Sequence, residues 1–160
     1  MPTPTTEPDP KDSDNILEQL QNAKDNFTVE VEGNTIKLSN LDKALWPPTA
    51  SHPALTKRHF LTYLVKVSTY FLPHLKDRPL TLTRYPSGIK GEHFFQKHLA
   101  QPIPDFVDRV NIREEDNAEH EYLVCNNLST LLWLGQLANL EFHTWFSRIS
   151  GGTNWSPSAA

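Results

Sequence analysis

The chain has 160 residues, of which 38% are hydrophobic, so its length and composition predict one domain with one ordinary core. A single cysteine excludes an intramolecular disulfide, and no apolar run approaches the roughly 20 residues that a membrane-spanning helix needs. The formal net charge of −4 argues against a uniformly basic surface for nucleic acid, but it does not exclude a local basic cluster.

The first 26 residues are rich in Pro, Thr, Asp and Glu and contain few large apolar side chains. Burial of so few apolar groups cannot offset the entropy of ordering, so we expect residues 1–26 to be a flexible tail. Within it, Ile16, Leu17 and Leu20 could form one or two helical turns. The start of the chain has neither a basic nor an apolar segment, so we predict no secretory signal and a cytoplasmic location.

Residues 27–38 alternate apolar and polar side chains around a Glu-Gly-Asn sequence, a pattern typical of a β-hairpin. Ser39 or Asn40 is expected to cap a short helical turn that ends by Trp46, because two prolines follow.

A long amphipathic helix is predicted to begin after Thr56, which is its expected N-cap, and to end near Pro73. Its apolar face consists of residues spaced three or four apart, namely Phe60, Tyr63, Leu64, Val67, Phe71 and Leu75.

The later part of the chain alternates between strand and helix patterns. Strands are predicted at 79–85, 93–98, 122–125 and 140–146, and a second helix, capped by Asn127, at 128–139. We expect residues 102–121 to form an exposed loop or edge strand and residues 149–160 a disordered tail. The predicted fold class is therefore α+β, with a mixed or antiparallel sheet and two main helices in one domain over residues 27–148.

Metal and nucleophilic chemistry have little support in the sequence. The seven histidines form no HxH or HExxH motif, and no predicted strand carries the Asp-x-Asp pair that two-metal phosphoryl transfer requires. Cys125 lies in an apolar strand pattern, where thiols are usually inert packing groups. We therefore predict no metal site and no catalytic residue in this chain.

The charges are distributed unevenly. Residues 37–97 contain ten basic side chains and only three acidic ones, so the rest of the chain is strongly acidic. A basic middle segment permits a phosphate-binding face, although a solvated lysine-rich surface explains the same pattern.

Phe94 and Phe95 place two rings on opposite faces of a predicted strand, next to the cation of Lys97. An exposed ring beside a cation could stack on an unpaired base, and the alternative is that both rings fill cores. Asn40, Lys43 and Lys57 lie in or beside predicted helix starts, where free N–H groups favour an anion. They could hold a terminal phosphate, or they could serve only solubility.

Five sequence segments occur in the order typical of one family. They are LSNLDKALWP at 38–47, LTK at 55–57, LPHLKDRPLTLTRYPSG at 72–88, FFQKH at 94–98 and LEFHTW at 140–145. Residues 28–148 thus resemble the N-terminal part of the polymerase domain of bacterial and archaeal DNA ligase D. This domain belongs to the archaeo-eukaryotic primase superfamily and acts in non-homologous end joining.

The resemblance implies roles for individual residues. Asn40, Lys43 and Lys57 match the positions that hold the 5′-phosphate at a DNA break or gap. Phe94 and Phe95 match the pair that stacks on the template. Arg84 and His143 match positions near the nucleotide pocket. Lys97, the cation beside the two rings, is a further candidate for nucleotide or DNA contact.

The resemblance also implies an Asp-x-Asp strand that holds two divalent metals, Mn or Mg, and this chain has no match to it. We therefore expect DNA-end binding without polymerisation by the chain alone, and no cofactor of its own. The implied partners are DNA with 5′-phosphorylated ends or gaps, a separate C-terminal polymerase half, a ligase or a Ku-type protein, and no membrane. The alternatives are a nucleotidyltransferase that is active only with that separate half, and a non-functional remnant or protein-interaction scaffold.

Overall fold

The computed structural model describes residues 9–22, 24–96, 102–113, 115–146, 148–150 and 154–156. Its helices there are α1 (Pro10–Leu20), α2 (Lys57–Leu75) and α3 (Leu128–Gln136). Its strands are β1 (Phe27–Val31), β2 (Asn34–Leu38), β3 (Ala44–Trp46), β4 (Leu55–Thr56), β5 (Pro79–Arg84), β6 (Phe94–Gln96), β7 (Asp108–Arg113), β8 (Glu119–Val124), β9 (Asn139–Thr144), β10 (Arg148–Ser150) and β11 (Asn154–Ser156). No helix in these ranges is long and apolar enough to span a bilayer.

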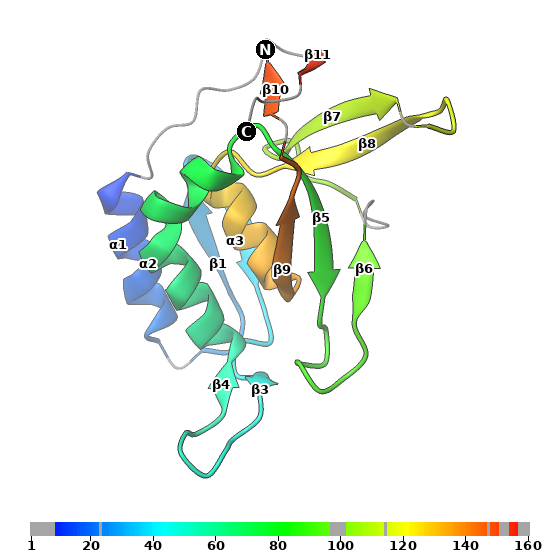
Figure 1. Ribbon diagram of the computed structural model, residues 1–160. Coiled ribbons are helices and arrows are strands. Elements are labelled where there is room, and N and C mark those ends of the chain that lie inside the picture. Colours follow the sequence, from blue (N-terminus) through cyan, green and yellow to red (C-terminus); the bar gives the residue numbers. More distant parts are fainter. Residues whose placement is uncertain are drawn as a thin grey trace.

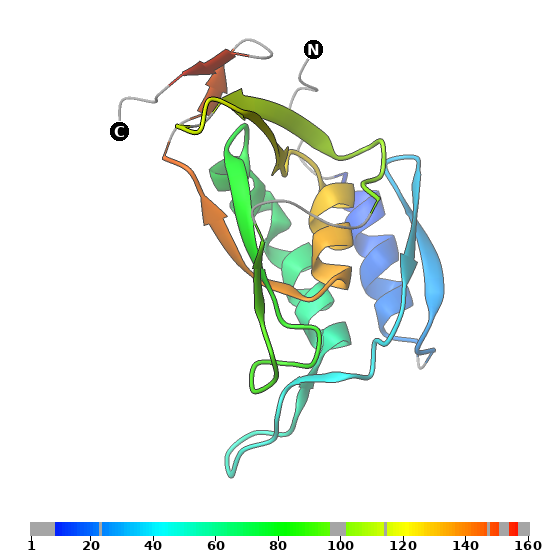
Figure 2. The same cartoon turned by 90° about the vertical axis from the view of Figure 1, so that its right-hand side faces the viewer.

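The helices form a layer between two β structures (Figures 1 and 2). On one side lies the β1–β2 hairpin, and on the other lies a five-stranded sheet. In that sheet β5 is the central strand: residues 82–84 pair with β6, residues 79–80 pair with β8, which in turn pairs with β7, and β9 pairs along residues 80–84. These pairings are all antiparallel. The predicted α+β class with an antiparallel sheet is confirmed.

The periodic segments of the sequence formed the elements that their patterns predicted. Thr56 caps α2, accepting a hydrogen bond from the His59 backbone N–H at 3.4 Å, and Pro73 lies in the last turn of the helix. Asn127 caps α3, with Oδ1 accepting from the Thr130 backbone N–H at 2.8 Å. Gly135 lets the two helices approach closely, because a Cβ there would lie 2.6 Å from a methyl carbon of Leu64.

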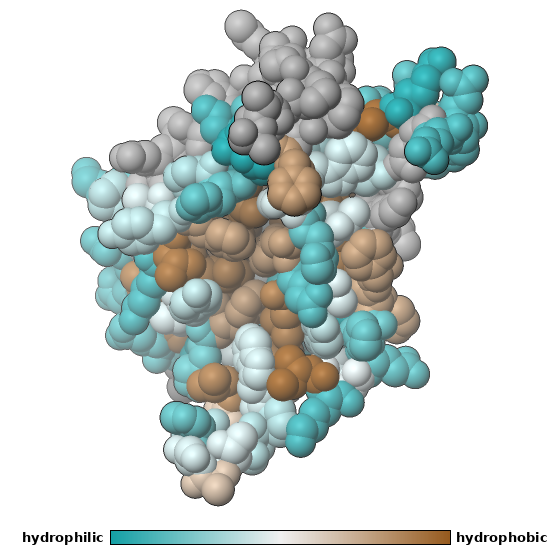
Figure 3. Space-filling model, viewed as in Figure 1, coloured by the Kyte–Doolittle hydropathy of each residue, from teal (hydrophilic) through white to brown (hydrophobic). Residues whose placement is uncertain are grey.

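The main core lies where these helices meet the sheet and the hairpin. It includes Leu38, Leu61 and Leu131, all completely buried. In Figure 3 the apolar side chains on the visible face gather between α2 and β9, where the rings of Phe71 and Phe142 pack edge-on with centroids 5.6 Å apart.

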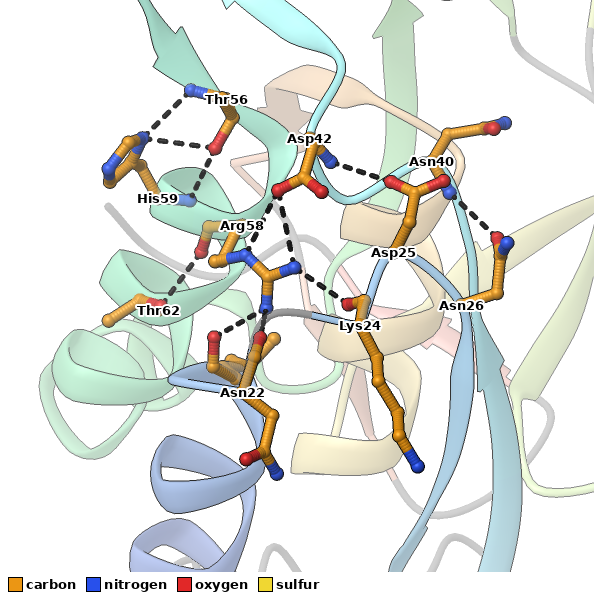
Figure 4. Close-up of polar contacts among 11 residues, drawn as sticks. Asn22, Lys24, Asp25, Asn26, Asn40, Asp42, Thr56, Arg58, His59 and Thr62 are labelled. Carbon is orange, nitrogen blue, oxygen red and sulfur yellow. Dashed lines mark hydrogen bonds and ion pairs between the residues drawn. The ribbon is translucent and has the colours of Figure 1, made fainter.

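The expectation of a flexible tail over residues 1–26 does not hold for residues 10–20, which form α1. Asp9 caps this helix, and Ile16 and Leu20 are buried in the main core. Arg58 of α2 secures the segment that follows, donating to the backbone oxygens of Leu20 and Lys24 at 2.6 and 2.7 Å (Figure 4). The composition suggested that the entropy lost on ordering would keep this segment flexible. Burial of two aliphatic side chains and these charge-assisted hydrogen bonds offset that entropy.

The short helical turn expected after Ser39 is absent. Asn40 has a φ of 55°, in the left-handed region, and its carbonyl accepts from the Lys43 backbone N–H at 3.1 Å. This closes a β-turn, and residues 44–46 continue as strand β3. The prediction failed because β3 gains a partner strand, β4, that the local sequence does not reveal.

Strands β7 and β8 form an arm that projects from the upper end of the molecule in Figure 1. One face of the arm carries a small separate cluster of buried residues, Val110, Ile112, Tyr122 and Val124, against which Trp145 packs. The segment 102–121, expected to be an exposed loop or edge strand, contains the edge strand β7 and the start of β8. The expected disordered tail is also partly strand, because β10 pairs with β11, and its other residues beyond 150 lie outside the described ranges.

Candidate functional site

The turn at residues 40–43 is joined directly to the start of α2. The carbonyl of Lys43 accepts from the Lys57 backbone N–H at 3.0 Å, and that of Leu41 accepts from the Arg58 N–H at 2.9 Å. Asn40 itself is exposed, and its N–H donates to Asn26 Oδ1 at 3.2 Å (Figure 4). Asn40, Lys43 and Lys57, which the sequence places up to 17 positions apart, therefore lie in one place.

One part of the expected phosphate site is wrong. The first N–H groups of α2 were expected to be free for an anion, but those of Lys57 and Arg58 are taken by the 40–43 turn. The next, of His59, is taken by the Thr56 side chain. Any anion at this place must therefore be held by side chains rather than by the amide groups of the helix N-terminus.

Lys57 is the buried member of the site, with only 5% of its surface exposed. Its Nζ donates to the Ser39 backbone oxygen at 3.1 Å. Burial first, and then the positive charges of Lys43 and Arg84, lower the pKa of Lys57 to about 8. A buried ammonium with two cationic neighbours is a place where a bound anion would be stabilised.

The loop after β5 closes one side of this cationic site. The Lys43 ammonium donates to the Pro86 backbone oxygen, and the Ile89 N–H donates to the Leu45 oxygen at 2.8 Å. Gly88 has a φ of 90°, and a Cβ there would lie 2.9 Å from the Leu45 oxygen. Only glycine fits this close approach, which keeps the loop beside β3.

Arg84, the last residue of β5, brings the third charge. Its Nε donates to the Leu137 backbone oxygen at 2.7 Å, which fixes the side chain where it acts electrostatically on Lys57. We call Lys43, Lys57 and Arg84 the cationic cluster. The resemblance implied nucleotide or DNA contact for Arg84 separately from the phosphate residues, and the structure brings it to the same cluster.

The two phenylalanines of β6 are both exposed. Phe94 is 48% and Phe95 is 60% exposed, so neither ring fills a core. In the antiparallel register Phe94 faces Arg84, and Phe95 faces Thr83. Neighbouring residues of a strand point to opposite faces, so the two rings flank the strand on its two sides.

His143 lies on β9, on the same face of the sheet as Phe95, and the two ring centroids are 5.9 Å apart. Its Nε2 is 3.0 Å from Glu141 Oε2, and the other oxygen of Glu141 accepts from the Tyr85 hydroxyl at 2.6 Å. Sequence reasoning did not single out Tyr85 or Glu141. The alternation in β9 would have placed Glu141 and His143 on one face of the strand. It could not have predicted that Tyr85, which follows β5, contacts them.

Three further predictions concern Lys97, metal ligands and Cys125. Lys97 lies outside the described residues. Within the described ranges no three His, Cys, Asp or Glu side chains are grouped so that they could hold a metal ion. Cys125 is completely buried, and burial raises the pKa of its thiol, which makes it unreactive.

Known proteins resemble the chain over most of its length. The family model of the LigD primase-polymerase domain matches residues 56–159. The bifunctional non-homologous end joining protein LigD of Bacillus subtilis is 40% identical over 114 residues, which are 71% of this chain and 17% of that protein. The multifunctional non-homologous end joining protein LigD of Mycolicibacterium smegmatis is 33% identical over 108 residues, which are 68% of this chain and 14% of that protein.

A solved structure agrees with these sequence matches. The polymerase domain of Mycobacterium tuberculosis Ligase D in complex with DNA superimposes with a TM-score of 0.66 at 30% identity. The match covers 76% of this chain and 42% of that one. The chain thus spans a small part of the full-length relatives and less than half of the solved polymerase domain.

Proposed function

The chain belongs to the LigD primase-polymerase family, and on that premise we propose that its described part binds DNA at a break or gap by gripping the 5′-phosphate. The observation that carries the proposal is the convergence of Asn40 with the cationic cluster. Phosphate oxygens are held best by cations in a partly buried site, where their charge is weakly screened. Lys57 is such a cation, and Lys43 and Arg84 increase the local potential.

The exposed rings of β6 support the second half of the proposal, in which Phe94 and Phe95 stack on template bases beside the gap. Arg84 lies opposite Phe94 in the sheet, so the ring sits at the end of the sheet where the cationic cluster lies. Base stacking on an exposed ring contributes about 1–3 kcal/mol per base and tolerates any sequence.

Nucleotide transfer is not part of this proposal. A complete family polymerase is expected to use Mn or Mg, and the described residues do not fit such a site, since they provide no cluster of metal ligands.

The test is a comparison of two gapped duplexes that differ only in a 5′-phosphate or a 5′-hydroxyl at the downstream end. We expect the phosphorylated DNA to bind at least about tenfold more tightly, since a charge-assisted bond contributes more than 1 kcal/mol. Lys43→Gln and Lys57→Met should each remove most of the difference. Lys66→Gln, on the exposed face of α2, is the matched control and should preserve it. Equal binding of the two duplexes by the unmodified protein would contradict the proposal.

A further inference from the structure

The Glu141 carboxylate joins two aromatic side chains on the outer face of the sheet. One oxygen accepts from the Tyr85 hydroxyl at 2.6 Å, and the other lies 3.0 Å from His143 Nε2. These two hydrogen bonds, that of Tyr85 first, keep the pKa of Glu141 below its ordinary value, so the carboxylate stays ionised. Because Tyr85 and Glu141 are 56 positions apart, this bridge ties the end of β5 to β9.

Each of the two bridged side chains carries a second ring. His93 stacks on Tyr85 with ring centroids 5.2 Å apart and planes inclined by 24°. The ring of Phe95 packs against that of His143, with the ring centroids 5.9 Å apart. Two rings thus contact the carboxylate and each packs against one further ring, and we call Tyr85, His93, Phe95 and His143 the ring patch.

The strand register explains why the ring patch lies on one face. Thr83 of β5 pairs with Phe95 on one side and with Glu141 on the other, so these three side chains share a face of the sheet. Thr83 is only 4% exposed, whereas Phe95 is 60% and the His143 side chain 50% exposed. The small threonine forms the floor of the patch, and the exposed rings of Phe95 and His143 stand beside it, whereas Tyr85 is half-buried and stacks on His93.

The chemistry of the patch favours nucleobases over phosphates. The exposed rings of Phe95 and His143 provide π-faces on which bases stack, while the ionised carboxylate of Glu141 repels phosphate. An arginine-bearing peptide is the other class of partner that rings and a carboxylate attract. It would compete with Tyr85 and His143 for the carboxylate oxygens, which already accept or contact those two side chains.

We propose that the ring patch, held in place by Glu141, takes the unpaired bases of a DNA strand, and that Glu141 is its positioning residue. This extends the proposed function, because it continues the stacking surface from Phe95 across β5 to β9. A strand on the patch would run with its bases toward the rings and its phosphates away from Glu141.

The experiment uses gapped DNA with a multi-nucleotide gap and 2-aminopurine at one unpaired template position at a time. Stacking on protein rings should change the fluorescence at two or more positions with the unmodified protein. Glu141→Ala and Tyr85→Phe should lose this change at one position or more and weaken binding by about fivefold. Glu141→Gln, whose amide oxygen still accepts the Tyr85 hydroxyl, should restore part of it. Glu119→Ala, at an exposed glutamate of the arm, is the control.

The outcomes separate this inference from the proposed function. Loss of stacking in Glu141→Ala with an intact 5′-phosphate preference supports both. Unchanged fluorescence in Glu141→Ala and Tyr85→Phe overturns the role of Glu141, whatever the phosphate preference. An arginine-rich peptide that binds the unmodified protein more tightly than the gapped DNA, and loses binding in Glu141→Ala, would assign the patch to a protein partner and overturn the inference.

Discussion

Lys57 differs from the surface lysine that its sequence context suggests. It is 5% exposed, and its pKa is lowered to about 8 by burial and by two cationic neighbours. Such a group loses its proton in the free protein as the pH rises through about 8, and a bound anion raises its pKa again, because the anion opposes the repulsion by the two cations. A buried lysine of this kind makes phosphate binding sensitive to pH near and above 8.

We therefore predict that the preference for a 5′-phosphate falls as the pH rises above about 8. The second ionisation of a phosphate monoester has a pKa near 6, so the DNA end keeps a constant charge from pH 7 to 9.5 and the protein alone titrates. Fluorescence anisotropy with the 5′-phosphate and 5′-hydroxyl duplexes at several pH values measures this, with the hydroxyl duplex as control. A ratio of affinities that stays constant from pH 7 to 9.5 would show that Lys57 does not contact the phosphate.

At the scale of elements, α1 and the segment after it are held by one side chain of α2. Arg58 donates to the backbone oxygens of Leu20, Asn22 and Lys24 and pairs with Asp42 at 3.3 Å (Figure 4). These contacts connect α1, α2 and the 40–43 turn. Through these contacts the N-terminal segment also supports the 40–43 turn, which is part of the cationic site.

Arg58→Ala should lower the free energy of unfolding by about 2 kcal/mol or more, because it leaves several backbone oxygens without a charged donor. It should also increase amide exchange in α1 before the rest of the chain. Thermal denaturation and hydrogen-exchange mass spectrometry measure the two effects. Arg113→Ala, which removes an exposed ion pair with Glu119 on the arm, should change stability by less than about 0.5 kcal/mol. If both variants behave alike, Arg58 is not a significant anchor.

At the scale of the whole molecule, part of the acidic charge lies away from the cationic cluster. The β7–β8 arm carries Asp108, Glu119 and Glu121, with Arg109 and Arg113 beside them, and lies at the upper end in Figure 1, while the 40–43 turn and the start of α2 lie toward the lower end, near β3 and β4. Figure 3 shows the outer part of the arm as hydrophilic. The net charge of −4 therefore does not describe the field that a DNA end meets at the cationic cluster.

DNA binding should weaken as salt rises in spite of the negative net charge. The logarithm of the affinity is expected to fall linearly with the logarithm of the salt concentration, and Lys43→Gln should reduce the magnitude of the slope by about 1. Glu121→Gln, on the acidic arm, should leave the slope unchanged. A slope that is near zero, or that responds equally to the two substitutions, would contradict a localised phosphate contact.

Local patterns were sufficient for most elements of the fold. The alternation in residues 27–38, the Thr56 and Asn127 caps and the apolar spacing of α2 each act over a few neighbouring residues, and the structure has the hairpin and both helices there. Local patterns failed for α1, which is held by the distant Arg58, and for β3, which is ordered by its partner strand β4.

By itself, the sequence determined the family, the fold class and the residue types of the site, because these depend on short motifs and on periodicity. The tertiary structure alone decided that Lys57 is buried among cations, that the first amides of α2 are occupied and that Glu141 bridges Tyr85 to His143. These properties arise between segments tens of residues apart, and burial and the distance between charges are set by packing, which no local pattern encodes.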